Sequence, residues 1–127
     1  MTQASRTPRR AKGKRLTPVQ VAFWVATIFA FIMAVLPQPP EFPGAPSDKV
    51  QHVIAFLVLA ALGVLAYPRT PKRGLLLGLA AFGAVIELIQ AIPGLNRDSD
   101  PMDWMADTLA AATVLTIFAI WRLAKRR

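Results

Sequence analysis

Ionisable side chains occur inside three of the most apolar stretches of the chain, where such groups are rare. Asp48 and His52 are four residues apart, so a helix would place them on one face. Glu87 lies inside the next stretch, and Asp107 lies inside the last one, four residues after Asp103. A histidine and carboxylates in apolar surroundings can exchange protons or bind a divalent cation. These residue types therefore indicate a site for a polar ligand.

The candidate residues of this site form two groups. Those that could act in catalysis are Glu87, Asp107 and His52. Those that could contact a bound group are Asp48, Lys49, Gln90, Arg97 and Asp103. Lys49 and Arg97 could hold a phosphate or a carboxylate, while the acids and the histidine handle protons or a metal ion. One histidine with several carboxylates suits Mg²⁺ or Mn²⁺ better than structural zinc, but no ligand spacing is diagnostic, so the metal and any cofactor stay open.

Helix capping is a competing explanation for three of the acids. Asp48 followed by Gln51 resembles a capping box at the start of a helix. Asp100, Pro101 and Asp103 are typical of an N-cap, a proline at the first helical position and an acid in the first turn.

Glu87 and Asp107 lie too far inside their helices for such a cap, so a chemical role explains them better. The chain contains no cysteine. No serine or threonine stands at triad-like spacing from the histidine, so the sequence shows no nucleophile.

Four apolar stretches must position these side chains, over residues 17–36, 50–67, 74–92 and 102–120. Each is close to the ~20 residues that cross a ~30 Å hydrocarbon layer. The 127 residues are 54% hydrophobic with a mean hydropathy of +0.43, which excludes a disordered chain and a soluble domain of this size. We therefore expect an all-α polytopic membrane protein, a four-helix transmembrane bundle over residues 17–122 between basic tails at 1–16 and 123–127.

The connections are expected to be short and the helices closely packed. The proline-rich connection 37–47 predicts extended, polyproline-like backbone. Small residues at Gly74 and Gly78, and at Ala80 and Ala84, are expected to let neighbouring helices approach.

The charges predict an orientation in the membrane. All but two of the 15 lysines and arginines lie before the first stretch, in the connection 68–73 or at the C-terminal end, and no acid lies among them. The positive-inside rule places both termini and this connection in the cytoplasm. The other two connections, with the helix ends beside them, carry Lys49, Arg97 and all seven acids, and they face outward. Because the basic residues flank spans, we expect contact with anionic lipids and no nucleic-acid binding.

The order and spacing of the candidate residues resemble the VanZ-like family, small bacterial membrane proteins named for a teicoplanin-resistance accessory. The resemblance covers about residues 48–114 and rests on Asp48-Lys49-x-x-His52-x-x-x-Phe56, Glu87-x-x-Gln90, Arg97 and Asp103-x-x-x-Asp107-Thr108-Leu109. Where the family often has Asn-Thr-x-Gly, this chain has Asp107-Thr108-Leu109-Ala110. The resemblance implies a fold, a location in the bacterial cytoplasmic membrane and a role in the cell envelope, but no reaction.

Two functions from different classes follow. The first is a site at the outer leaflet that binds, or acts on, the headgroup of a cell-envelope lipid or a glycopeptide-related ligand. The second is a non-catalytic accessory protein whose polar cluster only fixes helix packing. A transporter is disfavoured because the inner halves of the spans lack ionisable residues. In the first two cases the polar side chains are expected to meet near the outer surface, membrane lipids are partners, and the oligomeric state stays open.

Overall fold

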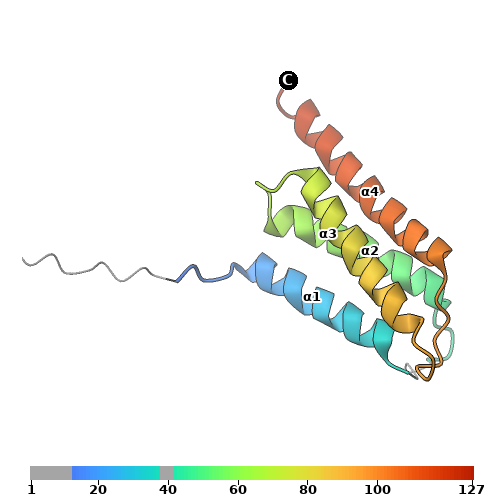
Figure 1. Ribbon diagram of the computed structural model, residues 1–127. Helices are drawn as coiled ribbons and strands as arrows, with labels where there is room; N and C mark the ends of the chain where they lie inside the picture. Colours follow the sequence, from blue (N-terminus) through green and yellow to red (C-terminus); the bar gives the residue numbers. More distant parts are fainter. Residues whose placement is uncertain (1–12, 38–41) are drawn as a thin grey trace, which may run out of the picture.

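The computed structural model describes residues 13–37 and 42–127 of the chain (Figure 1). Within these residues the regular elements are α1 (Pro18–Val35), α2 (Asp48–Ala66), α3 (Lys72–Gln90) and α4 (Pro101–Ala124). Each is long and apolar enough to cross a membrane. The prediction of an all-α protein with four helices of spanning length is confirmed. The rest of the N-terminal tail and residues 38–41 lie outside the described residues, so the expectations for them stay predictions.

The helix ends differ from the predicted ones by a few residues, for local reasons. α2 and α3 begin two residues earlier than expected, directly after Ser47 and Pro71. Asp48 favours the early start of α2, since an acid is stabilised by the positive end of the helix dipole. α4 continues to Ala124, which takes it into the predicted basic tail. Arg122 in its last turn favours the helix, since a cation is stabilised by the negative end of the helix dipole.

The described part of the connection before α2 contains a turn over residues 42–45, which interrupts the expected extended backbone. The backbone N–H of Ala45 donates to the carbonyl of Phe42 at 2.9 Å. Pro43 and Gly44 occupy the middle of the turn, and Gly44 has a φ of 78°. Glycine adopts a positive φ without steric cost, so a proline followed by a glycine favours a tight turn over a continuous polyproline helix.

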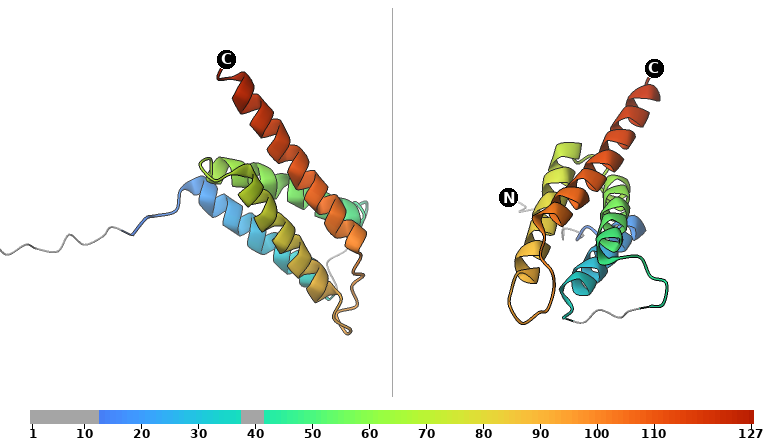
Figure 2. Two further views of the ribbon diagram at one scale, coloured as in Figure 1. Left: turned by 45° about the horizontal axis from the view of Figure 1, so that its top comes forward. Right: turned by 90° about the vertical axis from the view of Figure 1, so that its right-hand side faces the viewer.

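The four helices alternate in direction, and the polar residues and the basic residues gather at opposite ends of the bundle (Figures 1 and 2). We call one end the polar end, where α1 and α3 finish and α2 and α4 begin; it holds Asp48, Lys49, His52, Glu87, Gln90, Arg97, Asp98, Ser99, Asp100, Asp103 and Asp107. We call the other the basic end; it holds Lys14, Arg15, Arg69, Lys72, Arg73, Arg122, Lys125, Arg126 and Arg127. α4 extends beyond the other helices at the basic end (Figure 2).

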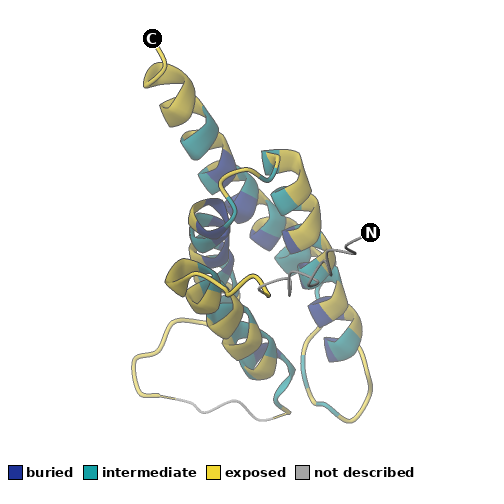
Figure 3. Cartoon of the chain, turned by 90° about the vertical axis from the view of Figure 1, so that its left-hand side faces the viewer, coloured by how far each residue is buried: buried dark blue, intermediate teal, exposed yellow. Residues whose placement is uncertain are grey.

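α2 is central to the packing and contacts the other three helices, whereas α1 reaches α2 and α3 but not α4 within the described residues. The buried core is built around Phe56 and Leu59 of α2, Ile86 of α3 and Ala111 of α4. Large apolar side chains cover the outward faces instead, and Figure 3 shows burial confined to the sides that face neighbouring helices. Such an exterior suits a lipid environment, which is as apolar as the side chains themselves.

The glycine most tightly packed against neighbouring helices is Gly83 of α3, not a member of the predicted pair Gly74 and Gly78. A Cβ atom at position 83 would lie 3.1 Å from Cδ1 of Trp104 and 3.2 Å from Cζ of Phe56. Trp104 is fixed there, because its indole N–H donates to the carbonyl of Ala80 at 2.8 Å. A Cβ atom at Gly78 would meet nothing within 4 Å, because this residue faces outward.

Candidate functional site

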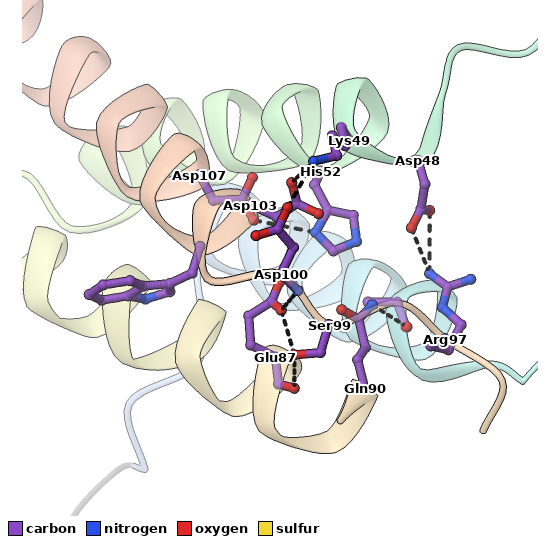
Figure 4. A network of polar contacts seen from close by, with 12 residues as sticks. Asp48, Lys49, His52, Glu87, Gln90, Arg97, Ser99, Asp100, Asp103 and Asp107 are labelled. Carbon is purple, nitrogen blue, oxygen red and sulfur yellow. Dashed lines mark hydrogen bonds and ion pairs between the residues drawn. The ribbon is translucent and has the colours of Figure 1, made fainter. Parts of the chain in front are cut away.

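A largely buried ion pair at the polar end joins α2 to α4 (Figure 4). His52 Nδ1 lies 3.3 Å from Oδ2 of Asp107. The side chain of Asp107 is 3% exposed and that of His52 is 11% exposed. Because a carboxylate only accepts hydrogen bonds, Nδ1 carries the proton in this contact, and Asp107 sets the orientation of the ring. The predicted meeting of His52 with Asp107 is therefore present.

Some buried polar atoms of this pair and its neighbour Thr108 form no hydrogen bond within the described part of the chain. His52 Nε2, Asp107 Oδ1 and Thr108 Oγ1 are buried and have no hydrogen-bond partner among the described residues. Most buried polar atoms in proteins have a partner, because burying one without a partner costs about 1–3 kcal/mol. The pair therefore has the features of a binding site whose polar atoms await a ligand. Thr108 has no separate signal in the sequence beyond its place after Asp107 in the motif Asp103-x-x-x-Asp107-Thr108-Leu109.

Lys49 forms ion pairs with two acids at the start of α4. Its ammonium nitrogen lies 3.0 Å from Oδ2 of Asp100 and 3.1 Å from Oδ1 of Asp103. Asp100 also caps α4 by accepting from the backbone N–H of Met102 at 2.9 Å, as predicted. That hydrogen bond, with the Lys49 ammonium, holds the pKa of Asp100 below its usual value. These contacts connect the first turn of α2 to the first turn of α4.

Arg97 pairs with Asp48, and this pairing corrects the expected capping box. The Arg97 guanidinium lies 3.2 Å from the Asp48 carboxylate, with the arginine side chain 6% exposed and the aspartate 57% exposed. The N-cap of α2 is Ser47, whose side chain makes no capping hydrogen bond. Gln51 donates instead to the carbonyl of Pro46 at 2.8 Å. Asp48 therefore holds the connection between α3 and α4 against α2.

Glu87 is buried but serves the connection to α4 rather than the His52–Asp107 pair. Its Oε2 accepts from the hydroxyl of Ser99 and from the backbone N–H of Asp100, each at 3.0 Å. The expectation that Glu87 lies beyond any cap is wrong, because it satisfies the N–H of the α4 N-cap residue from the neighbouring helix. Sequence reasoning also missed Ser99, whose only signal is its place directly before the capping residue.

Gln90 contacts α1 instead of the other candidates. Its amide donates to the carbonyl of Ala34 at 2.9 Å, and the side chain is buried. Ala34 belongs to the last turn of α1, where carbonyls lack intrahelical partners. Helix packing alone thus accounts for Gln90, and its predicted contact with a bound group stays a prediction.

Negative charge dominates the polar end. In the described part of the chain, the cations of Lys49 and Arg97 both have carboxylate partners. The acids there outnumber them and comprise Asp48, Glu87, Asp98, Asp100, Asp103 and Asp107. These acids do not form a metal site, since no three histidine, aspartate or glutamate side chains converge among the residues described. An open hollow runs beside the cluster along the connection from Gln90 to Ser99.

No family model matches this sequence, and no curated protein or solved structure is similar enough to it to count as a match. The candidate site therefore rests on the geometry of this chain's own residues.

Proposed function

We propose that this chain is a multi-pass protein of the bacterial cytoplasmic membrane, similar to the VanZ-like family, with both termini in the cytoplasm. Its polar end binds the headgroup of a cell-envelope lipid, or a glycopeptide-related ligand, at the outer leaflet. The four helices of spanning length support the location. The segregation of acids and basic residues to opposite ends supports the orientation.

The unpartnered polar atoms of His52 and Asp107 carry this proposal. The alternative is an accessory protein whose polar residues only fix the helices, and it explains Lys49, Arg97 and Glu87, which all have partners. It does not explain a buried carboxylate with one oxygen unbonded, because a network selected for packing gains nothing from that cost.

The chemistry available to the pair follows from its geometry. Asp107 holds the ring through Nδ1, so Nε2 of the neutral imidazole presents a lone pair to a bound group. Such a lone pair can accept a hydrogen bond from a ligand, and it can also take a proton from a bound hydroxyl or water. Binding is the function proposed, and His52 is the residue through which catalysis would act.

Asp107→Asn is expected to weaken ligand binding by about tenfold or more, since a hydrogen bond to a charged group contributes about 1.5–3 kcal/mol. The asparagine keeps the size of the side chain and can still contact His52, so the amount of protein in the membrane should hold. The measurement is glycopeptide sensitivity of cells that depend on the variant, with membrane abundance determined in parallel. Asp98→Asn is the matched control, because Asp98 is exposed. Wild-type sensitivity of Asp107→Asn at equal abundance would favour the accessory role.

The orientation can be tested by cysteine labelling, since the chain has no cysteine of its own. Single cysteines at Gly44 and Asp98, in the two connections at the polar end, should react with an impermeant reagent in intact cells. One at Thr70, in the connection at the basic end, should react only after the cells are opened. Labelling of Thr70 but not of Gly44 in intact cells would reverse the orientation.

A further inference from the structure

Three acids follow one another at the start of α4. Asp100 is the N-cap residue, and Asp103 and Asp107, which are four residues apart, lie on one face of the helix. The first two already bind an ammonium group, that of Lys49, at 3.0 and 3.1 Å. Asp107 lies one turn further along α4, and Figure 4 shows it beside Asp103. The start of α4 thus already binds one primary ammonium group, that of Lys49.

Asp107 has no lysine or arginine of its own among the described ion pairs. Among the described residues its side chain pairs with the His52 ring, and its Oδ1 has no hydrogen-bond partner. A carboxylate oxygen can only accept hydrogen bonds, so this free oxygen requires a group that donates.

An anionic group would be poorly matched to this site. Lys49 and Arg97 are both held by carboxylates and would have to leave them to bind a phosphate. Asp48, Glu87 and Asp107 lie on α2, α3 and α4 at the same end of the bundle as the His52 ring, so three helices contribute negative charge there. A phosphate placed at Asp107 would be repelled by these carboxylates, whereas a cation would be attracted.

We propose that the group bound at Asp107 and His52 is a primary ammonium, as carried by an aminolipid headgroup. This rests on the proposed function and names its ligand class. Such a group supplies a positive charge beside the buried carboxylate and an N–H donor for its free oxygen. A quaternary ammonium has the charge but no N–H, so it should bind less well.

The test uses the full chain, incorporated into vesicles of phosphatidylethanolamine, phosphatidylcholine and phosphatidylglycerol in equal amounts. The lipids that stay on the protein after extraction in detergent are then measured by native mass spectrometry. We expect the wild type and Asp98→Asn to retain phosphatidylethanolamine about tenfold over phosphatidylcholine, the loss expected for a missing hydrogen bond to a charged group. In Asp107→Asn the two lipids should be retained equally. Phosphatidylglycerol bound at the basic end should not change between variants.

Other outcomes separate this inference from the function on which it rests. If the retention lost in Asp107→Asn is that of phosphatidylglycerol, the ammonium is wrong while a headgroup site stands. If no lipid depends on Asp107, and His52→Gln also leaves retention unchanged, the headgroup site itself is refuted. His52→Gln should otherwise reduce the preference for phosphatidylethanolamine, and circular dichroism of both variants verifies that they are folded.

Free amines distinguish the source of the ammonium. If excess ethanolamine removes the retained phosphatidylethanolamine, the ammonium group alone is recognised. If it does not, and the preference over phosphatidylcholine persists, the intact lipid is the ligand. Both results support a primary ammonium, whereas equal displacement by choline would overturn the requirement for N–H donors.

Discussion

Glu87→Ala is expected to lower the free energy of unfolding by about 3 kcal/mol, because it removes two hydrogen bonds to a buried charged group. Those bonds come from the Ser99 hydroxyl and the Asp100 backbone N–H, and they hold the connection between α3 and α4 in place. Without Glu87 the N-cap residue of α4 loses its acceptor. The measurement is unfolding in detergent followed by circular dichroism, together with hydrogen exchange of residues 91–100, which should become faster.

Glu87→Gln separates charge from shape at the same position. The amide oxygen of glutamine can replace Oε2 and accept both hydrogen bonds, so only the contribution of the charge is lost. We expect about half of the effect of the alanine variant, since hydrogen bonds to neutral groups are about half as strong. Asp98→Asn, in the same connection but exposed, should leave stability unchanged. Equal stability of Glu87→Ala and Asp98→Asn would show that Glu87 does not hold this connection.

Gly83→Val is expected to destabilise the protein by about 1–3 kcal/mol, the usual cost of overpacking a well-packed core. Even a Cβ atom would stand within 3.2 Å of Phe56, which is buried, and within 3.1 Å of Trp104, which is held by its hydrogen bond to α3. Neither ring can move aside without losing packing or that hydrogen bond. Because the contact joins three helices, the variant should also unfold over a broader temperature range in detergent.

Gly78→Ala provides the matched control within the same helix. It adds a Cβ atom that meets nothing within 4 Å, and alanine is the better helix former by up to about 1 kcal/mol. Its melting temperature should equal or exceed that of the wild type. A stability of Gly83→Val equal to that of Gly78→Ala would contradict the close approach of α2, α3 and α4 at this glycine.

The sequence predicted the number of helices and the clustering of polar residues at one end. Both follow from local properties, since the length of an apolar run sets a helix of spanning length and alternating direction brings certain ends together. The cap of α4 at Asp100 was equally predictable, because an N-cap and its first turn are neighbours in the chain. The meeting of His52 with Asp107 also followed, since lipid-facing positions would be unfavourable for both.

The choice of partner for each charge could not be read from the sequence. Glu87 was expected to meet the other polar side chains and accepts from Ser99 and Asp100. Asp48, for which a cap of its own helix was one of two explanations, pairs with Arg97. Several acids and cations at one end allow many pairings of similar energy. Which one forms depends on the rotation of each helix about its axis and on the path of the connection between α3 and α4.

The sequence by itself determined the four helices, the polar and basic ends and the residues available for chemistry, because hydropathy, length and capping act over a few neighbouring residues. Only the tertiary structure decided that Gly83, rather than Gly78, is the tightly packed glycine of α3. It also decided which polar side chains form hydrogen bonds with one another and which have polar atoms left free to bind a ligand. That distinction depends on atoms from α2, α3 and α4 meeting within about 3 Å, the range of a hydrogen bond, and no local pattern specifies such a meeting.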